Sequence, residues 1–355
     1  MIRRDVFIFS VLQTHEYDFV VKCDIMKLRN LEIIILEKSK GGIFMYVNTK
    51  DILEKASKEY YAVPAFNINN MEFFHAILEG AIEKRAPLII ETSEGAIKYA
   101  GNGDIHKGAK YFVELVRLFA DSVDIPIALH LDHGKHFEYI IAAIKAGYSS
   151  VMIDASEEPF EENMKKTKEI VKIAHAAGVS VEAELGQLAG IEDNVSAAEN
   201  VLVDPEQAKI FVEETGVDFL APAIGTSHGA FKFKGEAKLD FERLQKVKEL
   251  TKIPLVLHGA SSVLPEYVKL AEEYGADLGG AKGVPEEELK KCVQFGINKV
   301  NTDTDLRIAF IAGMRKFLKE NPKEFDPRHY LGAGKKLVKE VVMNRLEFLG
   351  CAGKA

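Results

Sequence analysis

Eight short apolar runs alternate with longer segments of helical periodicity along most of the chain. Segments between the runs, such as 71–86 and 160–178, carry apolar residues at positions i, i+3 and i+4, and the second ends at glycine. Near-continuous apolar strands separated by helices predict a parallel sheet that helices cover. Eight such units over roughly 260 residues favour a closed (β/α)8 barrel, a TIM barrel, over an open, doubly wound sheet. The predicted strands are 62–68, 87–93, 126–132, 149–155, 180–186, 219–225, 254–260 and 297–303.

The third predicted strand ends in a cluster of ionisable residues. PIALHLDHG, residues 126–134, has the pattern of a buried strand that carries His130, Asp132 and His133 and breaks at Gly134. Imidazole is a metal ligand and a neighbouring carboxylate can move a proton, so the cluster suggests a metal-assisted active site. The same residues could instead be polar groups at a strand terminus that bond to backbone or water.

The distribution of polar residues over the predicted barrel favours the active site. In barrels of this kind the chemistry lies at the carboxyl ends of the strands, whereas the amino ends mainly serve stability. Here the amino ends are mostly Pro, Ala and aliphatic residues, and polar residues occupy the carboxyl ends. These residues are Asn67, Asn69, Ser93, Asp132, His133, Asp154, Glu184, His228, His258, Asn301 and Asp303.

Three histidines at equivalent strand ends predict a metal site. His133, His228 and His258 follow strands three, six and seven, so all three can point into one rim. Three imidazoles leave a tetrahedral zinc ion one open position for a substrate oxygen. Asp132 could donate or accept a proton beside the metal, or it could be the acceptor that orients a ligand histidine.

Acids follow the fourth and fifth strands. Asp154 and Glu184 could bind a second cation or pair with lysine. Glu182 shares the face of Glu184 by the period of two, so one of this pair could be a buried structural acid.

Glycine-flanked polar loops end the last three strands. They are GTSHG (225–229), HGASS (258–262) and NTDTD (301–305), and Lys232 and Arg307 could add positive charge. Small residues let backbone N–H groups approach an anion, and phosphate sites in barrels commonly follow strands seven and eight. Each loop alone is typical of a tight turn. Together they suggest a phosphorylated substrate with neighbouring hydroxyls or a carbonyl.

Composition excludes several other classes of partner. The net charge is -8 with no basic block, which argues against nucleic acid or an anionic membrane as the main partner. No apolar stretch is long enough for a transmembrane helix. Cys23, Cys292 and Cys351 are far apart and form no disulfide framework, which suits a reducing, cytoplasmic compartment.

Seven motifs together resemble the class II, zinc-dependent fructose-1,6-bisphosphate aldolases. In order they are HLDHG, SVMIDAS, VEAELG, GTSHGAFKF, LVLHGASS, NTDTDLR and DPRHYL, and they run from about Met45 to the C-terminus. The resemblance implies reversible cleavage of fructose 1,6-bisphosphate into dihydroxyacetone phosphate and glyceraldehyde 3-phosphate through a zinc-stabilised enediolate. It implies that the three histidines bind zinc and that Asp132 is the proton donor to the aldehyde oxygen. Asp154 and Glu184 match a second or alternative site for a divalent or monovalent cation.

The resemblance also implies which residues hold the sugar phosphate. Glu192, in the loop LAGIEDN after strand five, matches the mobile carboxylate that moves the ketose carbon's proton. Arg328 looks like the arginine that reaches into a neighbouring subunit's site, which implies a homodimer or homotetramer. Ser93 and Arg307 match contacts to the far end of the substrate. The dihydroxyacetone phosphate half matches Gly229, Lys232, Gly259, Ser261, Asn301, Asp303 and Thr304, with Ala260 and Thr302 in the same loops.

Three other readings stay open. Tagatose-1,6-bisphosphate aldolases share the zinc histidines, although NTDTD after strand eight and GAFKFKG with Lys232 look like the fructose branch. A Schiff-base aldolase on the same barrel would need a buried strand lysine, for which Lys299 is the candidate. A non-catalytic barrel that binds carbohydrate phosphates would need neither Asp132 nor Glu192.

Residues 1–44 fit poorly with the rest of the chain. They contain short apolar runs without the features of a signal peptide, whereas 45–355 reads as a single barrel domain. Met45 opens an amphipathic helix capped by Asn48 or Thr49. We hypothesise that the native protein starts at Met45 and that the preceding residues are a disordered or misassigned leader. We expect the intact mass of the native protein to correspond to a start at Met45, and a mass that includes earlier residues would contradict this.

Overall fold

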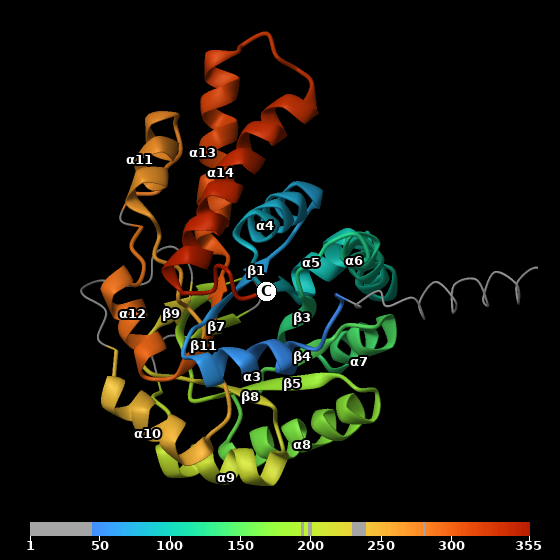
Figure 1. Cartoon of the computed structure of the whole chain (residues 1–355), viewed down its shortest axis with the longest axis vertical. Coiled ribbons are helices and arrows are strands. Elements are labelled where there is room, and N and C mark those ends of the chain that lie inside the picture. Colours follow the sequence, from blue (N-terminus) through green and yellow to red (C-terminus); the bar gives the residue numbers. More distant parts are fainter. Residues whose placement is uncertain (1–44, 193–194, 198–200, 229–238, 280) are drawn as a thin grey trace, which may run out of the picture. The chain divides into compact units, whose positions relative to one another are not determined.

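A computed structural model describes residues 45–192, 195–197, 201–228, 239–279 and 281–355 of the chain (Figure 1). Residues 45–355 form one compact unit. Residues 1–44, for which a leader was hypothesised, and residues 229–238 lie outside the described residues.

Eight parallel strands close into a barrel, with neighbours in sequence order and β1 paired to both β2 and β11. Every predicted strand is present, so the prediction of a (β/α)8 barrel is confirmed and the open, doubly wound sheet is wrong. The strands are apolar along their length because helices cover the outside of the barrel and side chains fill the inside. They are β1 (Val63–Asn67), β2 (Leu88–Thr92), β3 (Ile127–Gly134), β4 (Ser150–Ile153), β5 (Ser180–Leu185), β8 (Phe219–Pro222), β10 (Leu255–Leu257) and β11 (Ile297–Thr302).

Several helices begin where a side chain caps the backbone, and the helices bury one face against the barrel. Asn70 accepts a hydrogen bond from the backbone N–H of Phe73 at 3.0 Å and starts α4, which buries Phe74 and Ile77. The helices around the barrel are α3 (Thr49–Glu59), α4 (Met71–Lys84), α5 (Glu94–Ala100), α6 (Ile105–Ala120), α7 (Phe137–Ala146), α8 (Phe160–Ala176), α9 (Pro205–Thr215), α10 (Phe241–Thr251), α11 (Pro265–Glu273) and α12 (Glu286–Gln294).

Two further helices end the chain. α13 (Thr304–Glu320) and α14 (Pro327–Phe348) form a hairpin that extends away from the barrel in Figure 1, and the inner part of α14 packs on α4. The two helices approach closely at Gly313, where an added Cβ would stand 2.5 Å from the carbonyl oxygen of Ala333. The hairpin therefore depends on a small residue at this crossing.

A second, three-stranded sheet was absent from the sequence-based interpretation. β6 (Ala189–Glu192) pairs antiparallel with β7 (Val195–Ala197) and parallel with β9 (Ser227–His228). The prediction that Glu192 lies in a loop is therefore wrong, because its backbone ends strand β6. Strands of two to four residues are too short to show a period-two pattern.

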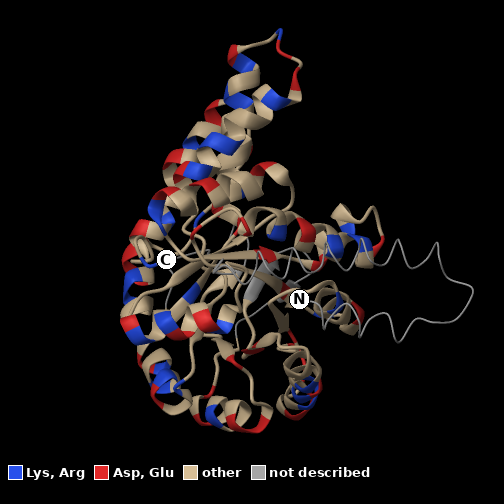
Figure 2. Cartoon of the chain, turned by 45° about the vertical axis from the view of Figure 1, so that its right-hand side comes forward, with Lys and Arg blue, Asp and Glu red and all other residues tan. Residues whose placement is uncertain are grey.

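Charges of both signs are mixed over the outer helices. Figure 2 shows Lys and Arg alternating with Asp and Glu along these helices, and no basic stripe appears in this view. None of the described helices carries an apolar stretch of the length that crossing a bilayer requires.

Candidate active site

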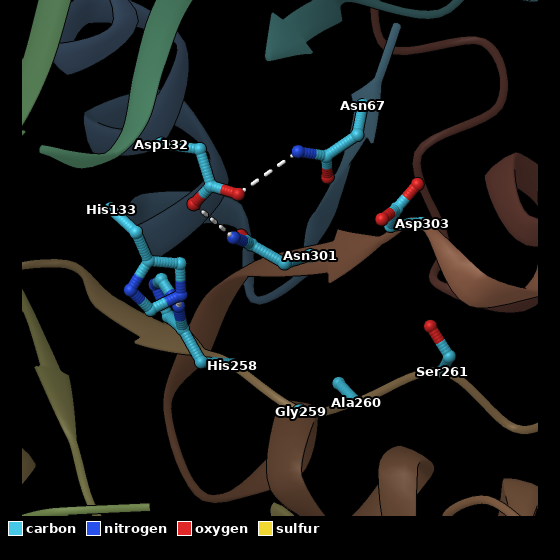
Figure 3. Close-up of a pocket in the computed structure, with 9 residues that line it drawn as sticks. All are labelled: Asn67, Asp132, His133, His258, Gly259, Ala260, Ser261, Asn301 and Asp303. Carbon is cyan, nitrogen blue, oxygen red and sulfur yellow. Dashed lines mark hydrogen bonds between the residues drawn. The ribbon is translucent and has the colours of Figure 1, made fainter. Parts of the chain in front are cut away.

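A β-bulge brings Asp132 and His133 to the same side of the barrel wall. Between β3 and β4 the register passes from Leu131↔Val151 to Gly134↔Ile153, so β3 carries one extra residue. His133 adopts a left-handed conformation with φ 45°. In a regular strand two successive side chains point to opposite faces, whereas here both reach one pocket (Figure 3).

The carboxylate of Asp132 is held from both sides. The side-chain amide of Asn67 in β1 donates to Oδ2 at 2.9 Å, and the amide of Asn301 in β11 donates to Oδ1 at 2.9 Å (Figure 3). Asp132 is only 7% exposed, so these bonds replace much of its contact with water. Two donors, one on each oxygen, fix the position and orientation of the carboxylate.

Two imidazoles converge beside this carboxylate. Nε2 of His133 lies 2.8 Å from Nδ1 of His258, and each ring has an acid at its other nitrogen. Nδ1 of His133 contacts Asp154 Oδ2 at 2.8 Å, and Nε2 of His258 contacts Glu182 Oε1 at 2.6 Å. Ligand atoms of Asp132, His133 and His258 all lie within 4.8 Å of one another.

A second group of possible ligands shares His133. Its nitrogen and the carboxylate oxygens of Asp154 and Glu184 also lie within 4.8 Å of one another. Burial together with the charge of Asp154 raises the pKa of Glu184 well above its ordinary value. Among the described residues, Glu184 Oε2 has no hydrogen-bond partner. Nearby acids, imidazoles and an unsatisfied buried oxygen fit a metal ion, since a cation would satisfy that oxygen and offset the like charges.

The pocket around these groups is lined by residues at the carboxyl ends of four strands and in the loops that follow them. Its lining is Asn67, Asp132, His133, His258, Gly259, Ala260, Ser261, Asn301 and Asp303 (Figure 3). An ionisable cluster in a concave site at the carboxyl end of a barrel is the arrangement expected of an active site.

Sequence comparison identifies the family. The family model described as "Fructose-bisphosphate aldolase class-II" matches residues 47–277 and 278–354. The chain belongs to this family. It is 55% identical over 313 residues to the fructose-bisphosphate aldolase of Helicobacter pylori, covering 87% of this chain and 100% of that protein. It is 50% identical to the fructose-bisphosphate aldolase of Thermus caldophilus, covering 88% and 100%. The resemblance inferred from the seven motifs is thus confirmed.

A solved structure agrees with the fold. The crystal structure of the YdjI aldolase from Escherichia coli K12 superposes with a TM-score of 0.70 at 32% identity, covering 88% of this chain and 100% of that chain.

Four residues that the resemblance assigns to substrate binding are not among those that line this pocket of the class-II aldolase. Thr302 and Thr304 are buried at the end of β11 and the start of α13. Arg307 pairs with Asp303 at 2.7 Å and lines a neighbouring pocket with Asn69, Asn70, Gly95, Ala96 and Tyr99. Ser93 is buried at the start of α5, where its Oγ accepts a hydrogen bond from Ala96 N at 3.1 Å.

The remaining predicted residues are either distant from the pocket or have side chains outside the described part of the structure. Arg328 is in the first turn of α14 at the far end of the hairpin, exposed and paired with Asp326 at 2.6 Å. The backbone of His228 ends β9 and that of Glu192 ends β6. Gly229 and Lys232 lie outside the described residues.

The Schiff-base candidate is locked between two acids. Lys299 Nζ lies 2.5 Å from Glu91 Oε1 and 2.9 Å from Glu182 Oε2, and all three side chains are fully buried. Burial alone would lower the pKa of Lys299, but the two carboxylates outweigh it and hold the pKa above its ordinary value. A Schiff base needs a neutral, accessible amine. The structure therefore disfavours Lys299 as a nucleophile.

One supporting residue was missed by sequence reasoning. Asp305, buried at the start of α13, accepts backbone N–H bonds from Ser262 at 3.1 Å and Val263 at 2.6 Å. It also pairs with the buried Arg345 of α14 at 3.0 Å. The loop after β10 is thus tied to the hairpin. The second aspartate of NTDTD is the sequence signal, but it does not distinguish a ligand contact from a loop anchor.

Gly259 allows two loops of the site to touch. Its φ is 59°, and an added Cβ would stand 2.5 Å from the carbonyl oxygen of Ser227, the residue before His228. A side chain here would push apart the loops that carry His258 and His228, because the contacting atoms are backbone.

We predict that Gly259→Ala lowers the free energy of unfolding by about 3 kcal/mol or more. Gly178→Ala is the matched control, because Gly178 has φ 72° and nothing within 4 Å of an added Cβ. The control isolates backbone strain, which costs about 1 kcal/mol. Urea unfolding followed by circular dichroism measures both variants, and equal losses would contradict the close contact with Ser227.

Proposed function

We propose that this protein is a metal-dependent aldolase that reversibly cleaves fructose 1,6-bisphosphate into dihydroxyacetone phosphate and glyceraldehyde 3-phosphate. The carrying observation is the convergence of His133 and His258 beside the fixed carboxylate of Asp132, in a class-II aldolase chain. The names of the relatives from Helicobacter pylori and Thermus caldophilus support the substrate.

The metal proposal rests on the donor set. His133, His228 and His258 would hold zinc, with Nε2 of the first and Nδ1 of the last turned toward each other. When bound there, zinc supplies Lewis acidity that polarises the ketone of the substrate and stabilises its enediolate. Asp154 and Glu184, which lie beside His133, would hold a second or alternative divalent or monovalent cation.

The protein's own groups would move the protons. Asp132 is positioned by two amides, so in the condensation direction it can give a proton to the aldehyde oxygen, which becomes the C4 hydroxyl, and in cleavage it can remove that hydroxyl proton as the aldehyde forms. Glu192 would transfer the proton at the ketose carbon from the β6–β7 hairpin, in a chain segment that can close over substrate.

The two phosphates would be held at opposite ends of the pocket. Backbone and side-chain groups of the loops after β9, β10 and β11 would bind the dihydroxyacetone phosphate half, where small residues allow close approach. They are Gly229, Lys232, Gly259, Ala260, Ser261, Asn301, Thr302, Asp303 and Thr304. Ser93 and Arg307, beside the neighbouring pocket, would contact the other end.

We also propose a cytoplasmic homodimer or homotetramer in which Arg328 completes a neighbouring subunit's site, because Arg328 is exposed and lies outside the pocket of its own chain. Tagatose 1,6-bisphosphate is the alternative substrate. The ratio of its turnover to that of fructose 1,6-bisphosphate distinguishes the two. A barrel that only binds carbohydrate phosphates is disfavoured by the buried, fixed carboxylate of Asp132.

We predict that fructose 1,6-bisphosphate cleavage is lost on treatment with a chelator and recovered when zinc is added back. The rate of dihydroxyacetone phosphate release measures cleavage, and tagatose 1,6-bisphosphate is the comparison substrate. Activity that is indifferent to chelator and stopped by borohydride would instead mean a Schiff-base mechanism.

We predict that Asp132→Ala lowers turnover by about 100-fold to 10,000-fold while the protein retains its zinc, because a positioned acid–base group contributes on that order. Asn67→Ala is the control. It removes one hydrogen bond to Asp132 but leaves the carboxylate, so we expect a smaller loss. Steady-state kinetics and metal analysis give the two readouts, and unchanged turnover in Asp132→Ala would remove this residue from the mechanism.

A further inference from the structure

Four ionisable side chains lie inside the barrel, beneath the pocket. This interior charge cluster consists of Glu91 in β2, His130 in β3, Glu182 in β5 and Lys299 in β11, all fully buried. The interiors of such barrels are usually filled by branched apolar side chains. Burying ions costs free energy even when they are paired, so a cluster of this kind calls for a role beyond packing.

Glu182 joins the cluster to the metal site. Its Oε1 lies 2.6 Å from Nε2 of His258, and the side chain of His258 is 1% exposed. The other nitrogen, Nδ1, is the one that faces His133. A carboxylate can only accept, so in the neutral His258 ring it favours the tautomer with the proton on Nε2 and the lone pair on Nδ1. That tautomer is the one that can bind a metal in the pocket.

The second oxygen of Glu182 is held by Lys299. Its Oε2 lies 2.9 Å from Lys299 Nζ, and Nε2 of His130 is 3.4 Å away. His130 is itself held by Ser150, whose Oγ lies 2.8 Å from Nδ1. The ammonium group of Lys299 can only donate, so the side chain at position 182 must present an oxygen to it. The carboxylate has a second oxygen for His258, and no other side chain of this length has two equivalent acceptors.

We propose that Glu182 is a positioning residue that selects the metal-binding tautomer of His258, and that Lys299 orients and balances its charge. The inference rests on the proposed metal site and deepens it. It explains why Lys299 is buried in the barrel although it forms no Schiff base. It also explains why Glu182 is buried beside the site although it is not itself a metal ligand.

The variant Glu182→Gln tests the tautomer directly. With one oxygen, the amide would turn that oxygen to Lys299 and its NH2 toward His258. Nε2 of His258 would then have to accept, which moves the ring proton to Nδ1 and blocks the metal. We expect the zinc dissociation constant of the full-length metal-free protein, measured by competition with a chromogenic chelator, to rise by about 10-fold to 100-fold.

Two companion variants separate positioning from structural support. Glu91→Gln alters the same cluster and also contacts Lys299, but the described ion pair of Glu91 is with Lys299 and not with His258, so we expect nearly unchanged zinc affinity. In Glu182→Gln/Lys299→Met the amide oxygen is free to turn to His258, so we expect zinc affinity to recover in part. A merely structural role predicts that the second substitution adds to the damage.

The outcomes are distinct from those of the proposed function. Wild-type zinc affinity in Glu182→Gln, or an equal loss in Glu91→Gln, would overturn this inference while leaving the aldolase intact. A wild-type protein that binds no zinc would overturn both. Should the amide variant fail to fold, Glu182→Asp keeps the charge beside Lys299 and withdraws the carboxylate from His258. The same weakening of zinc binding is then expected, and unchanged affinity would overturn the inference.

Discussion

Strand geometry is the constraint on which this site depends. In a parallel barrel the carboxyl ends of all strands lie at one rim. In a regular strand, however, only every second side chain points into the barrel. The extra residue in β3 removes this limit and lets two neighbouring residues serve different chemistry. Asp132 is then reached by amides from β1 and β11, whereas His133 meets the imidazole that follows β10. Asp132 and the proposed metal ligand His133 therefore lie next to each other in the chain and contact different residues.

Much of the fold could be read from the chain because its signals are local. Apolar runs and helical periodicity identified all eight barrel strands, and the rule for barrel rims brought together Asp132, His133, His258 and Asn301. The role of each rim residue was less accessible. Asn67 and Asn301 appeared as polar residues at strand ends, but the sequence does not show that both point at one carboxylate.

Features that depend on distant contacts could not be predicted. Lys299 and Glu182 are separated by 117 positions, and a charged residue within an apolar strand is equally typical of a nucleophile and of half an ion pair. Only the closed barrel, which places Lys299 next to Glu182, shows that this lysine is part of an ion pair. Asp305 is similar, since only the packed structure shows that it accepts from the loop after β10. The β6–β7 hairpin was missed because its strands are too short to give a period.

The backbone contact at Gly259 has a thermodynamic consequence. Ser227, which Gly259 touches, belongs to β9, and β9 pairs with β6, the strand that ends at Glu192. Backbone contacts thus join three segments of the chain: the loop carrying His258, the strand carrying His228 and the hairpin carrying Glu192. Free energies of binding at linked elements are reciprocal: under the proposed function, a substrate held by this hairpin and a cation held by His228 and His258 would change each other's affinity by the same factor. Substrate and metal would then be partners in one cooperative equilibrium.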